Sequence, residues 1–110
     1  MELKEFSRDN SIQLIGSTGK YSLIMDIKIE GNILHIAHIE GTGAGYLVKQ
    51  LLTHVEEIAR QRKLIIDTHV IDDKRLISLT KRLGFMEDKR FDSKPYDHLV
   101  RRFTKTPWRK

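Results

Sequence analysis

The sequence predicts a mixed α/β fold, with a mainly antiparallel central sheet, a long helix after a glycine-rich loop, and a second, short helix. Two observations lead to this prediction. Short β-type runs fill the first forty residues, and an apolar stripe with a period of about 3.6 residues follows the loop. A chain of 110 residues has room for one core. We therefore expect a single domain over residues 1–105 and a basic tail over residues 106–110.

Three β-type runs precede the loop. The first two, "SIQLIGS" and "YSLIMDIKIEG", flank a turn at residues 16–20, and a turn at residues 30–32 leads to "ILHIAHIE". We expect three antiparallel strands in a meander. Strict alternation in the third run places Leu34, Ile36 and His38 on one face and Ile33, His35, Ala37 and Ile39 on the other. Because both faces are largely apolar or histidine, this run is typical of a central strand.

The most regular pattern begins after the loop. From Tyr46 to about Arg62 the apolar residues trace one stripe, made of Leu47, Val48, Leu51, Leu52, Val55, Ile58 and Ala59. Polar residues occupy the opposite side, as in an amphipathic helix that packs on a sheet. The pattern therefore predicts a long helix.

The remaining segments continue the α/β order. "KLIIDTHV" has the composition of a buried strand, and "DDKRLISLTKRL" that of a short helix with Asp72 or Asp73 as its N-cap. Gly84 is a typical helix stop. "FMEDKRF" and "YDHLVRRFTK" have strand character on either side of a turn at Pro95. We expect them to form a terminal pair of strands.

The composition indicates the cellular compartment and the kinds of binding partner that we expect. The chain has no cysteine, no signal-like segment and no long apolar run, so we expect a soluble cytoplasmic protein without membrane contact. Residues 1–59 carry five Lys or Arg and eight Asp or Glu, whereas residues 60–110 carry fifteen and seven. A basic half of this kind fits a solvated surface, a polyanionic cofactor, nucleic acid or an acidic protein. A second copy of the chain, in a homodimer, is a further candidate partner.

The stretch "HIEGTGAGYLVKQLL" places Gly41, Gly43 and Gly45 before the long helix. Glycines let backbone amides crowd an anion, and a helix N-terminus adds partial positive charge. Two known nucleotide loops do not fit. In "GSTGKYS", Lys20 is followed by a tyrosine and a strand, whereas a Walker A loop needs Ser or Thr and a helix. The spacing G-x-G-x-G also differs from the dinucleotide fingerprint G-x-G-x-x-G.

Another pattern does fit. The segment "EGTGAGYLVKQLLTHVEEIARQRKL" resembles the acyl-CoA-binding motif of the GNAT family of N-acyltransferases, Gln/Arg-x-x-Gly-x-Gly/Ala, with Glu40, Gly43 and Gly45 at its positions. Further along, "DDKRLISLTKRLGF" is similar to the second signature of the family, whose Leu and Gly-Phe positions match here. The resemblance covers about residues 33–104.

The resemblance implies that the protein binds acetyl-CoA or CoA. In the family, the central strand and the strand after the long helix splay apart, the CoA arm inserts between them, and loop amides hold the pyrophosphate. Carried onto this sequence, the implied cofactor site consists of Ile36, Ala37, Ile39, Glu40, Gly41, Thr42, Gly43, Ala44, Gly45, Tyr46 and Asp73.

Several positions depart from the family pattern. Thr80 stands where the family commonly has the tyrosine that protonates the leaving thiolate, and a threonine hydroxyl is far less acidic than a phenol. Glu40 replaces Gln or Arg beside the pyrophosphate, and Asp73 replaces Asn. The N-terminal segment also leaves little space for the helices that usually form part of the acceptor wall. We therefore expect Thr80 at best to relay a proton through water.

A histidine is the side chain best suited to accept a proton near neutral pH. We predict that His38 or a water accepts the proton, with His35, His54, His69 and Glu40 as further candidate bases. No two histidines have a zinc-site spacing with a third ligand, so we expect no metal.

The leading prediction is an acyl-CoA-dependent N-acetyltransferase that acts on a primary amine. The alternative is a catalytically inactive GNAT-like binding or structural module, which contacts nucleic acid or a protein through its basic C-terminal half. Tyr96, Phe103 and Trp108 would then stack on bases. The sequence spells out no known nucleic-acid motif.

Overall fold

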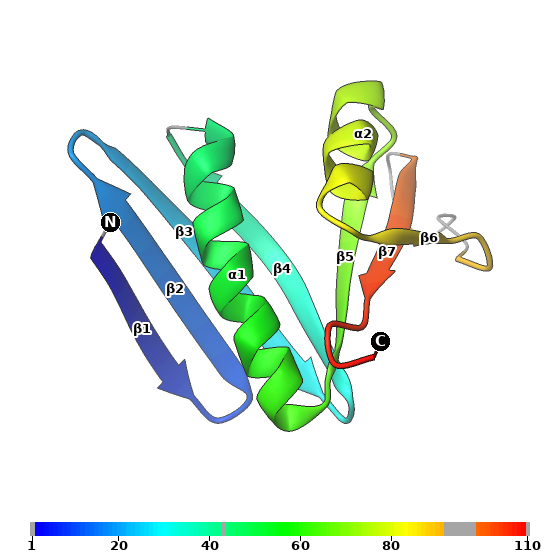
Figure 1. The fold of residues 1–110 in the computed structure, drawn as a ribbon, viewed down its shortest axis with the longest axis horizontal. Helices are drawn as coiled ribbons and strands as arrows, with labels where there is room; N and C mark the ends of the chain where they lie inside the picture. The colour runs from blue at the N-terminus through cyan, green and yellow to red at the C-terminus, as the bar shows by residue number, and fades with distance from the viewer. Residues whose placement is uncertain (1, 43, 92–98, 110) are drawn as a thin grey trace.

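The computed structural model describes residues 2–42, 44–91 and 99–109 (Figure 1). Its seven strands form one sheet in the order β1-β2-β3-β4-β5-β7-β6. The strands are β1 Glu2–Arg8, β2 Ser11–Thr18, β3 Tyr21–Glu30, β4 Ile33–Gly41, β5 Ile65–Ile71, β6 Met86–Asp88 and β7 Val100–Lys105. Helix α1 spans Ala44–Arg62 and helix α2 spans Lys74–Arg82. Within the described chain, neither helix is long and apolar enough to cross a membrane.

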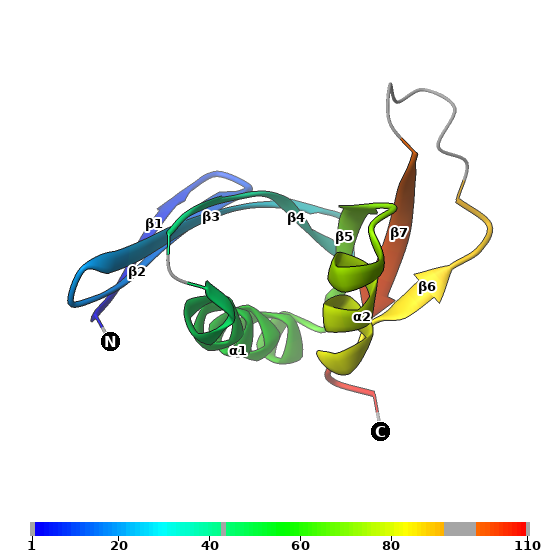
Figure 2. The same cartoon turned by 90° about the horizontal axis from the view of Figure 1, so that it is seen from above.

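The sheet is mixed and mainly antiparallel, as predicted. Strands β4 and β5 are parallel, and the other five neighbouring pairs are antiparallel. Both helices lie on the same side of the sheet (Figure 2). On β1 to β4, the side opposite α1 has no covering helix in the described part of the chain, and we call this side the open face.

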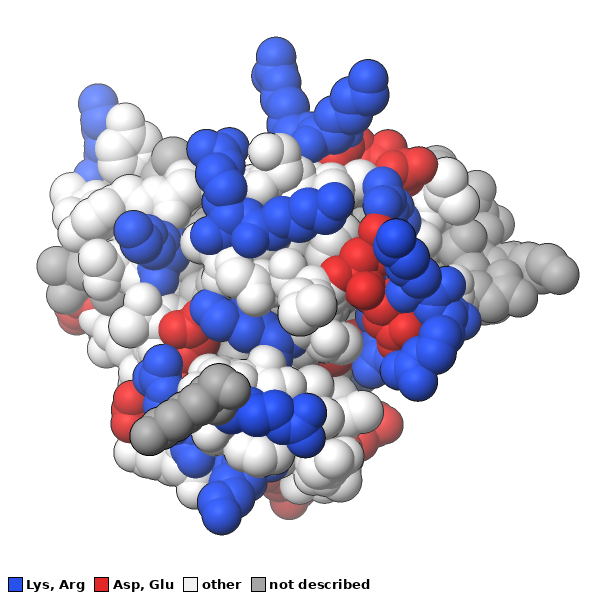
Figure 3. Space-filling view, turned by 45° about the vertical axis from the view of Figure 1, so that its right-hand side comes forward, with Lys and Arg blue, Asp and Glu red and all other residues white. Residues whose placement is uncertain are grey.

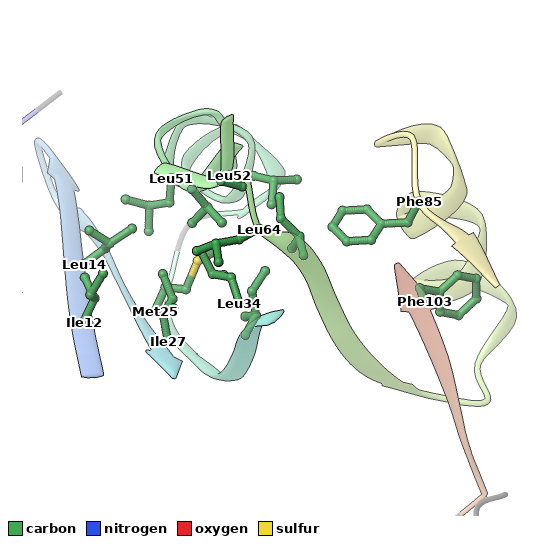
Figure 4. Packing of buried hydrophobic residues seen from close by; sticks show 14 of the residues in the cluster. Ile12, Leu14, Met25, Ile27, Leu34, Leu51, Leu52, Leu64, Phe85 and Phe103 are labelled. Atoms are coloured by element: carbon green, nitrogen blue, oxygen red, sulfur yellow. The ribbon is translucent and has the colours of Figure 1, made fainter. Parts of the chain in front are cut away.

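Helix α1 closes the core, and its predicted apolar stripe is confirmed. Five side chains of this helix are buried, namely Leu47, Leu51, Leu52, Val55 and Ala59. Leu51 and Leu52 of this helix belong to the same buried cluster as Met25 and Leu34 of the sheet (Figure 4). Each fully buried aliphatic side chain contributes about 1.5–3 kcal/mol to folding. The stripe therefore fixes α1 across the middle of the sheet.

Strand β1 was not predicted, because its sequence does not alternate between apolar and polar residues. It nevertheless pairs with β2 residue by residue, from Glu2 opposite Ser17 to Arg8 opposite Ser11. Almost all of its side chains are exposed, as is usual for a polar edge strand. The predicted turn at residues 16–20 includes the observed one but begins too early, because β2 runs to Thr18 and the chain turns at Gly19, where φ is +53°.

A β-bulge in β4 changes which face its side chains occupy. Asp26 is paired with His38 but Ile27 with Ile36, so Ala37 is an extra residue in β4. The prediction that His38 shares a face with Leu34 and Ile36 is therefore wrong, and so is the prediction that Ile39 shares a face with His35, because Ile39 is paired with Met25. His38 lies with Asp26 on the open face, because the bulge reverses the alternation.

Helix α2 begins and ends as predicted. Asp73 is the N-cap, and its Oδ1 accepts hydrogen bonds from the backbone N–H groups of Arg75 (2.9 Å) and Leu76 (3.1 Å). Gly84 follows the C-cap with φ +94°, a conformation that favours glycine. The predicted turn at Pro95 lies outside the described residues.

The C-terminal strand is more deeply buried than its basic sequence suggests. Phe103 of β7 is fully buried, so the prediction that it stacks on bases is wrong. The indole N–H of Trp108 donates a hydrogen bond of 2.9 Å to the carbonyl of Leu64, before β5. Tyr96, the third aromatic residue of that prediction, lies outside the described residues.

Candidate functional site

The sheet contains an internal gap between its two parallel strands. The β4–β5 ladder starts at Ile33 opposite Ile65 and ends at Ile36 opposite Thr68. Beyond these residues the strands diverge toward their carboxyl ends (Figure 1). From Ala37 onward, the edge of β4 that faces β5 has no partner in that ladder. Backbone N–H and C=O groups along such an edge need other partners, which water or a ligand supplies.

A cavity of about 500 Å³ fills this gap, and we call it the β4–β5 cavity. Its walls include Val48 and Leu52 of α1 and Leu79 and Thr80 of α2. Phe85, which follows α2 in the chain, also lines it. The lining is mostly apolar with a few polar groups, which is the usual composition of a site for a small molecule or a cofactor.

Large apolar side chains remain exposed among the residues that line the β4–β5 cavity. Ile39, Ile71 and Leu76 line it, and between 42% and 56% of each residue's surface is exposed. They come from β4, β5 and α2, so three elements contribute to one apolar rim. An apolar rim on a concave site is typical of a surface that a ligand covers.

Both helices begin at the same edge of the sheet, where β4 and β5 end (Figure 1). The crevice at the carboxyl ends of parallel strands is a common ligand site in open α/β sheets. The first backbone N–H groups of a helix lack partners within the helix and favour an anion. The N-terminus of α1 therefore supplies hydrogen-bond donors beside the β4–β5 cavity.

The glycines of the loop before α1 serve different purposes. Gly41 has φ +145°, and a Cβ there would lie 2.3 Å from the carbonyl oxygen of Ser22. The contact with β3 thus requires glycine. At Gly45, in contrast, a Cβ would meet nothing within 4 Å, so no described neighbour requires glycine in this first turn of α1. Gly43 lies outside the described residues.

The predicted cofactor residues separate into three groups. Ile36, Ala37 and Ile39 line the β4–β5 cavity. Gly41, Thr42, Ala44, Gly45 and Tyr46 lie in the loop and first turn of α1, where Tyr46 is 57% exposed and the backbone N–H of Thr42 donates a 2.9 Å hydrogen bond to Ser22. Glu40 and Asp73 lie apart from both groups. The carboxylate of Asp73 caps α2 and is engaged by that helix.

Glu40 lies on the open face. It is paired with Ile24 in the β3–β4 ladder, one residue away from the pair of Ile39 with Met25, whose side chain packs toward α1. Its carboxylate approaches the His38 ring, with 3.4 Å between Oε2 and Nε2. The negative charge therefore lies on the side of the sheet opposite the N-terminus of α1.

The two predicted catalytic residues border the β4–β5 cavity from different elements. His38 lines it from β4, and 58% of its side chain is exposed to solvent. Thr80 lines it from α2, but its hydroxyl donates a 2.7 Å hydrogen bond to the carbonyl of Leu76 in its own helix. The Thr80 proton is thus already engaged, whereas His38 is accessible.

A polar cluster that the sequence did not predict lies beside the cavity. Asp67 is buried in β5, and its Oδ2 lies 2.6 Å from Nδ1 of His35. Its Oδ1 accepts a hydrogen bond from Nε of Arg102 on β7. The neighbouring His69 lines the β4–β5 cavity. Burial lowers the pKa of His69 below its usual value of 6.5; Asp67 opposes this effect, while His35 and Arg102 add to it.

The same cluster brings three potential metal ligands together. Ligand atoms of His35, Asp67 and His69 lie within 4.8 Å of one another, although their sequence spacing did not indicate a metal site. The guanidinium of Arg102 occupies one oxygen of Asp67 and opposes a divalent cation there. One feature of the sequence could have indicated this cluster. The run "KLIIDTHV" has the composition of a buried strand but contains a carboxylate, and a buried charge needs a partner.

Carboxylates neutralise part of the basic C-terminal half, chiefly on β7. Arg101 binds both Glu87, with 2.7 Å between Nε and Oε2, and Asp72. Arg102 bridges Asp67 and Asp88. Figure 3 shows Lys and Arg interspersed with Asp and Glu on this side of the molecule. A mixed surface of this kind offers fewer free cations than the sequence count suggests.

The remaining candidate bases lie in different surroundings. His54 projects from α1 to β1, where its Nε2 is 2.9 Å from Oε1 of Glu5. It does not line the β4–β5 cavity. The structure thus brings His38 and His69 to the cavity, and it separates them from His54.

No protein-family model, curated protein or solved structure matches the chain. The candidate function therefore rests on the geometry of the β4–β5 cavity and on the motif resemblance in the sequence.

Proposed function

We propose that the protein is an acyl-CoA-dependent N-acetyltransferase, which moves an acetyl group from acetyl-CoA to a primary amine. The observation that carries the proposal is the β4–β5 cavity. It lies between two diverging parallel strands, beside the N-terminus of α1, and it reaches His38. The resemblance to the GNAT family implies a gap in the sheet at this place for the CoA arm.

The start of α1 fits a pyrophosphate. Its first N–H groups favour an anion, and the space around Gly45 lets phosphate oxygens approach the backbone. Lys74 and Arg75 begin α2 at the same edge of the sheet and add positive charge. Glu40, which would repel a phosphate, is on the open face.

The β4–β5 cavity fits a pantetheine arm. Val48, Leu52 and Leu79 offer apolar contacts to its methylene and methyl groups. The edge of β4 from Ala37 onward offers N–H and C=O groups to its two amides, as a neighbouring strand would. One side of the arm thus receives hydrogen bonds, and the other receives apolar packing.

Acetyl-CoA, when bound, supplies the acetyl group as a thioester. The amine nitrogen bonds to the carbonyl carbon of this thioester and loses a proton. The C–S bond then breaks, and the sulfur leaves as a thiolate that takes up a proton. His38 is the accessible base at the cavity and accepts the proton of the amine. Backbone N–H groups of β4 polarise the carbonyl oxygen. Thr80 reaches the leaving sulfur at most through water, because its hydroxyl donates to Leu76.

The test is isothermal titration of the protein with acetyl-CoA, together with two variants. Gly45→Glu places a carboxylate in the open space at the start of α1, and we expect it to weaken binding at least about tenfold. Gln61→Glu adds the same charge at the far end of the same helix and is the matched control. Absence of heat and of a thermal shift at millimolar acetyl-CoA would rule out the proposal.

A second candidate is a catalytically inactive module with the same cofactor cavity. The observation in its favour is that the hydroxyl of Thr80 is engaged by its own helix and that no tyrosine stands at this position. Thiol release from acetyl-CoA with a panel of primary amines separates the two candidates. Tight binding without turnover favours the inactive module, and turnover that His38→Ala reduces supports the enzyme.

A further inference from the structure

A second cavity, of about 470 Å³, lies on the open face across β1 to β4, and we call it the open-face hollow. The strand register arranges its side chains in rows. Phe6 is opposite Gln13, Gln13 is opposite Asp26, and Asp26 is opposite His38. One row of four side chains therefore crosses four strands and ends at the predicted base.

A second row runs parallel to the first. Arg8 is opposite Ser11, Ser11 is opposite Lys28, and Lys28 is opposite His35. On β1, β2 and β3 the two rows are two residues apart, which corresponds to about 7 Å along a strand. The hollow thus has an acidic row, containing Asp26, next to a basic row, containing Arg8 and Lys28.

The charged groups of the hollow form no salt bridge within the described residues. Asp26 accepts a 3.0 Å hydrogen bond from the amide of Gln13 but has no salt bridge with any described residue. Arg8 and Lys28 likewise form no salt bridge within the described part of the chain, although each lies in the row next to that of Asp26. Side chains of both signs therefore remain available to a ligand.

The open-face hollow and the β4–β5 cavity meet at the bulge of β4. Ala37 and His38 line both of them. A molecule in the hollow would thus face the thioester end of a ligand in the β4–β5 cavity, with the His38 ring between them. The hollow is on the side of the sheet that α1 leaves free, so the two ligands would enter from opposite faces.

We propose that the open-face hollow binds the acceptor, and that the acceptor is a small zwitterion, carrying a carboxylate as well as the primary amine. Asp26 and Gln13 hold the ammonium group beside His38, which takes one of its protons before the nitrogen attacks; the second proton goes to the leaving thiolate. Arg8 and Lys28 hold the carboxylate in the neighbouring row. The rows are about 7 Å apart along the strands, and the long side chains of Arg8 and Lys28 can bend toward Asp26, so that both rows reach the two charges of a small zwitterion. Turnover of such an acceptor rests on the proposed acetyltransferase function, whereas its binding does not.

The binding test uses the whole protein without acetyl-CoA. Glycine, β-alanine and L-lysine are titrated while backbone amide shifts are followed by NMR, with propylamine and propionate as singly charged controls. We expect the best zwitterion to bind at least about tenfold more tightly than either control, with shifts at Gln13, Asp26, Lys28 and His38. Comparable affinity for propylamine, or shifts outside the hollow, would overturn the inference.

Substitutions test which side chains bind each of the two charges of the ligand. Lys28→Gln should weaken a zwitterion and leave propylamine unchanged, whereas Asp26→Asn should weaken both. Lys20→Gln, in the turn before β3, and Glu30→Gln, at the end of β3, make the same charge changes outside the hollow and are the controls. Equal effects of Lys28→Gln and Lys20→Gln contradict the assignment.

Thiol release from acetyl-CoA separates this inference from the proposed function. If a zwitterion binds in the hollow but no amine is acetylated, the acceptor-type site stands and the enzyme does not. If amines are acetylated with a KM that Asp26→Asn and Lys28→Gln leave unchanged, the enzyme stands and the assignment of the hollow is wrong. If the proposed function and the assignment of the hollow are both correct, Asp26→Asn and Lys28→Gln raise the KM for zwitterions.

Discussion

The two ends of the sheet use their charged residues in opposite ways. On β5, β6 and β7, Arg101 and Arg102 each bind two carboxylates, and Asp67 is buried between His35 and Arg102. On the open face of β1 to β4, Arg8, Asp26 and Lys28 lie in adjacent rows with no salt bridge to any described residue. The first set of charges holds the fold together, and the second set is available to bind.

The same contrast separates two glycines on either side of the β4–α1 connection. The structure requires Gly41, because any side chain there would collide with β3. It does not require Gly45, which faces open space at the start of α1. Residues that the fold needs and residues that a ligand needs can therefore be told apart by what surrounds them.

The largest expected effect concerns these two glycines. Gly41→Ala should destabilise the protein by about 3 kcal/mol, because φ +145° strains a side chain and its Cβ would lie 2.3 Å from Ser22 O. Gly45→Ala should be neutral or stabilising by up to about 1 kcal/mol, since alanine favours the helix. Urea unfolding of both variants measures the difference, and equal stabilities would contradict the contrast.

The next effect compares two aspartates on the same face of the sheet. Asp67→Ala should destabilise the protein by about 2–3 kcal/mol, because it leaves His35 and Arg102 without their shared acceptor. Asp26→Ala should change stability by less than about 0.5 kcal/mol, because among the described residues its carboxylate has a hydrogen bond from Gln13 alone and no salt bridge. Thermal unfolding near neutral pH distinguishes them. A large loss of stability in Asp26→Ala would mean that the fold uses the hollow after all.

A smaller effect depends on pH. The Arg101 guanidinium holds the pKa of Glu87 below its usual value of 4.5. Since the folded-state pKa is the lower one, this stabilisation is complete above about pH 4.5 and is lost as the pH falls through the folded-state pKa. The urea midpoints of the wild type and Arg101→Gln should therefore differ near neutral pH and converge in acid.

Arg8→Gln is the matched control for this experiment, because it removes the same charge from the open face, where Arg8 has no salt bridge with a described residue. Its midpoint should follow that of the wild type at every pH. If the urea midpoint of Arg101→Gln differs from that of the wild type by the same amount in acid as near neutral pH, the ion pair with Glu87 is not the cause of the difference.

Much of the fold could be predicted from the sequence because its signals are local. The stripe of α1 has a clear period, and Asp73 and Gly84 are ordinary helix boundaries. Strand β1 could not be predicted, because a polar edge strand has no apolar alternation and is defined by its pairing with β2. The bulge at Ala37 could not be predicted either, because one extra residue appears only in the register with β3.

Some parts of the candidate site could likewise be predicted from local sequence, and others could not. The loop before α1 and the gap between β4 and β5 were expected from a motif that is contiguous in sequence. The partners of Asp67 and the two rows of the open-face hollow are set by pairing between strands that are distant in sequence. His38 was chosen as a base for its chemistry, but its position between the two cavities follows from the bulge.

The most direct test of the central claim is an NMR titration of the protein with CoA, in which backbone amide shifts are assigned to residues. If CoA binds in the β4–β5 cavity, the largest shifts will be at Ala37, Ile39 and Gly45, and the amides of Arg101 and Arg102 will change little. Shifts confined to the basic residues of β7, or no saturable shifts at millimolar CoA, would contradict the account.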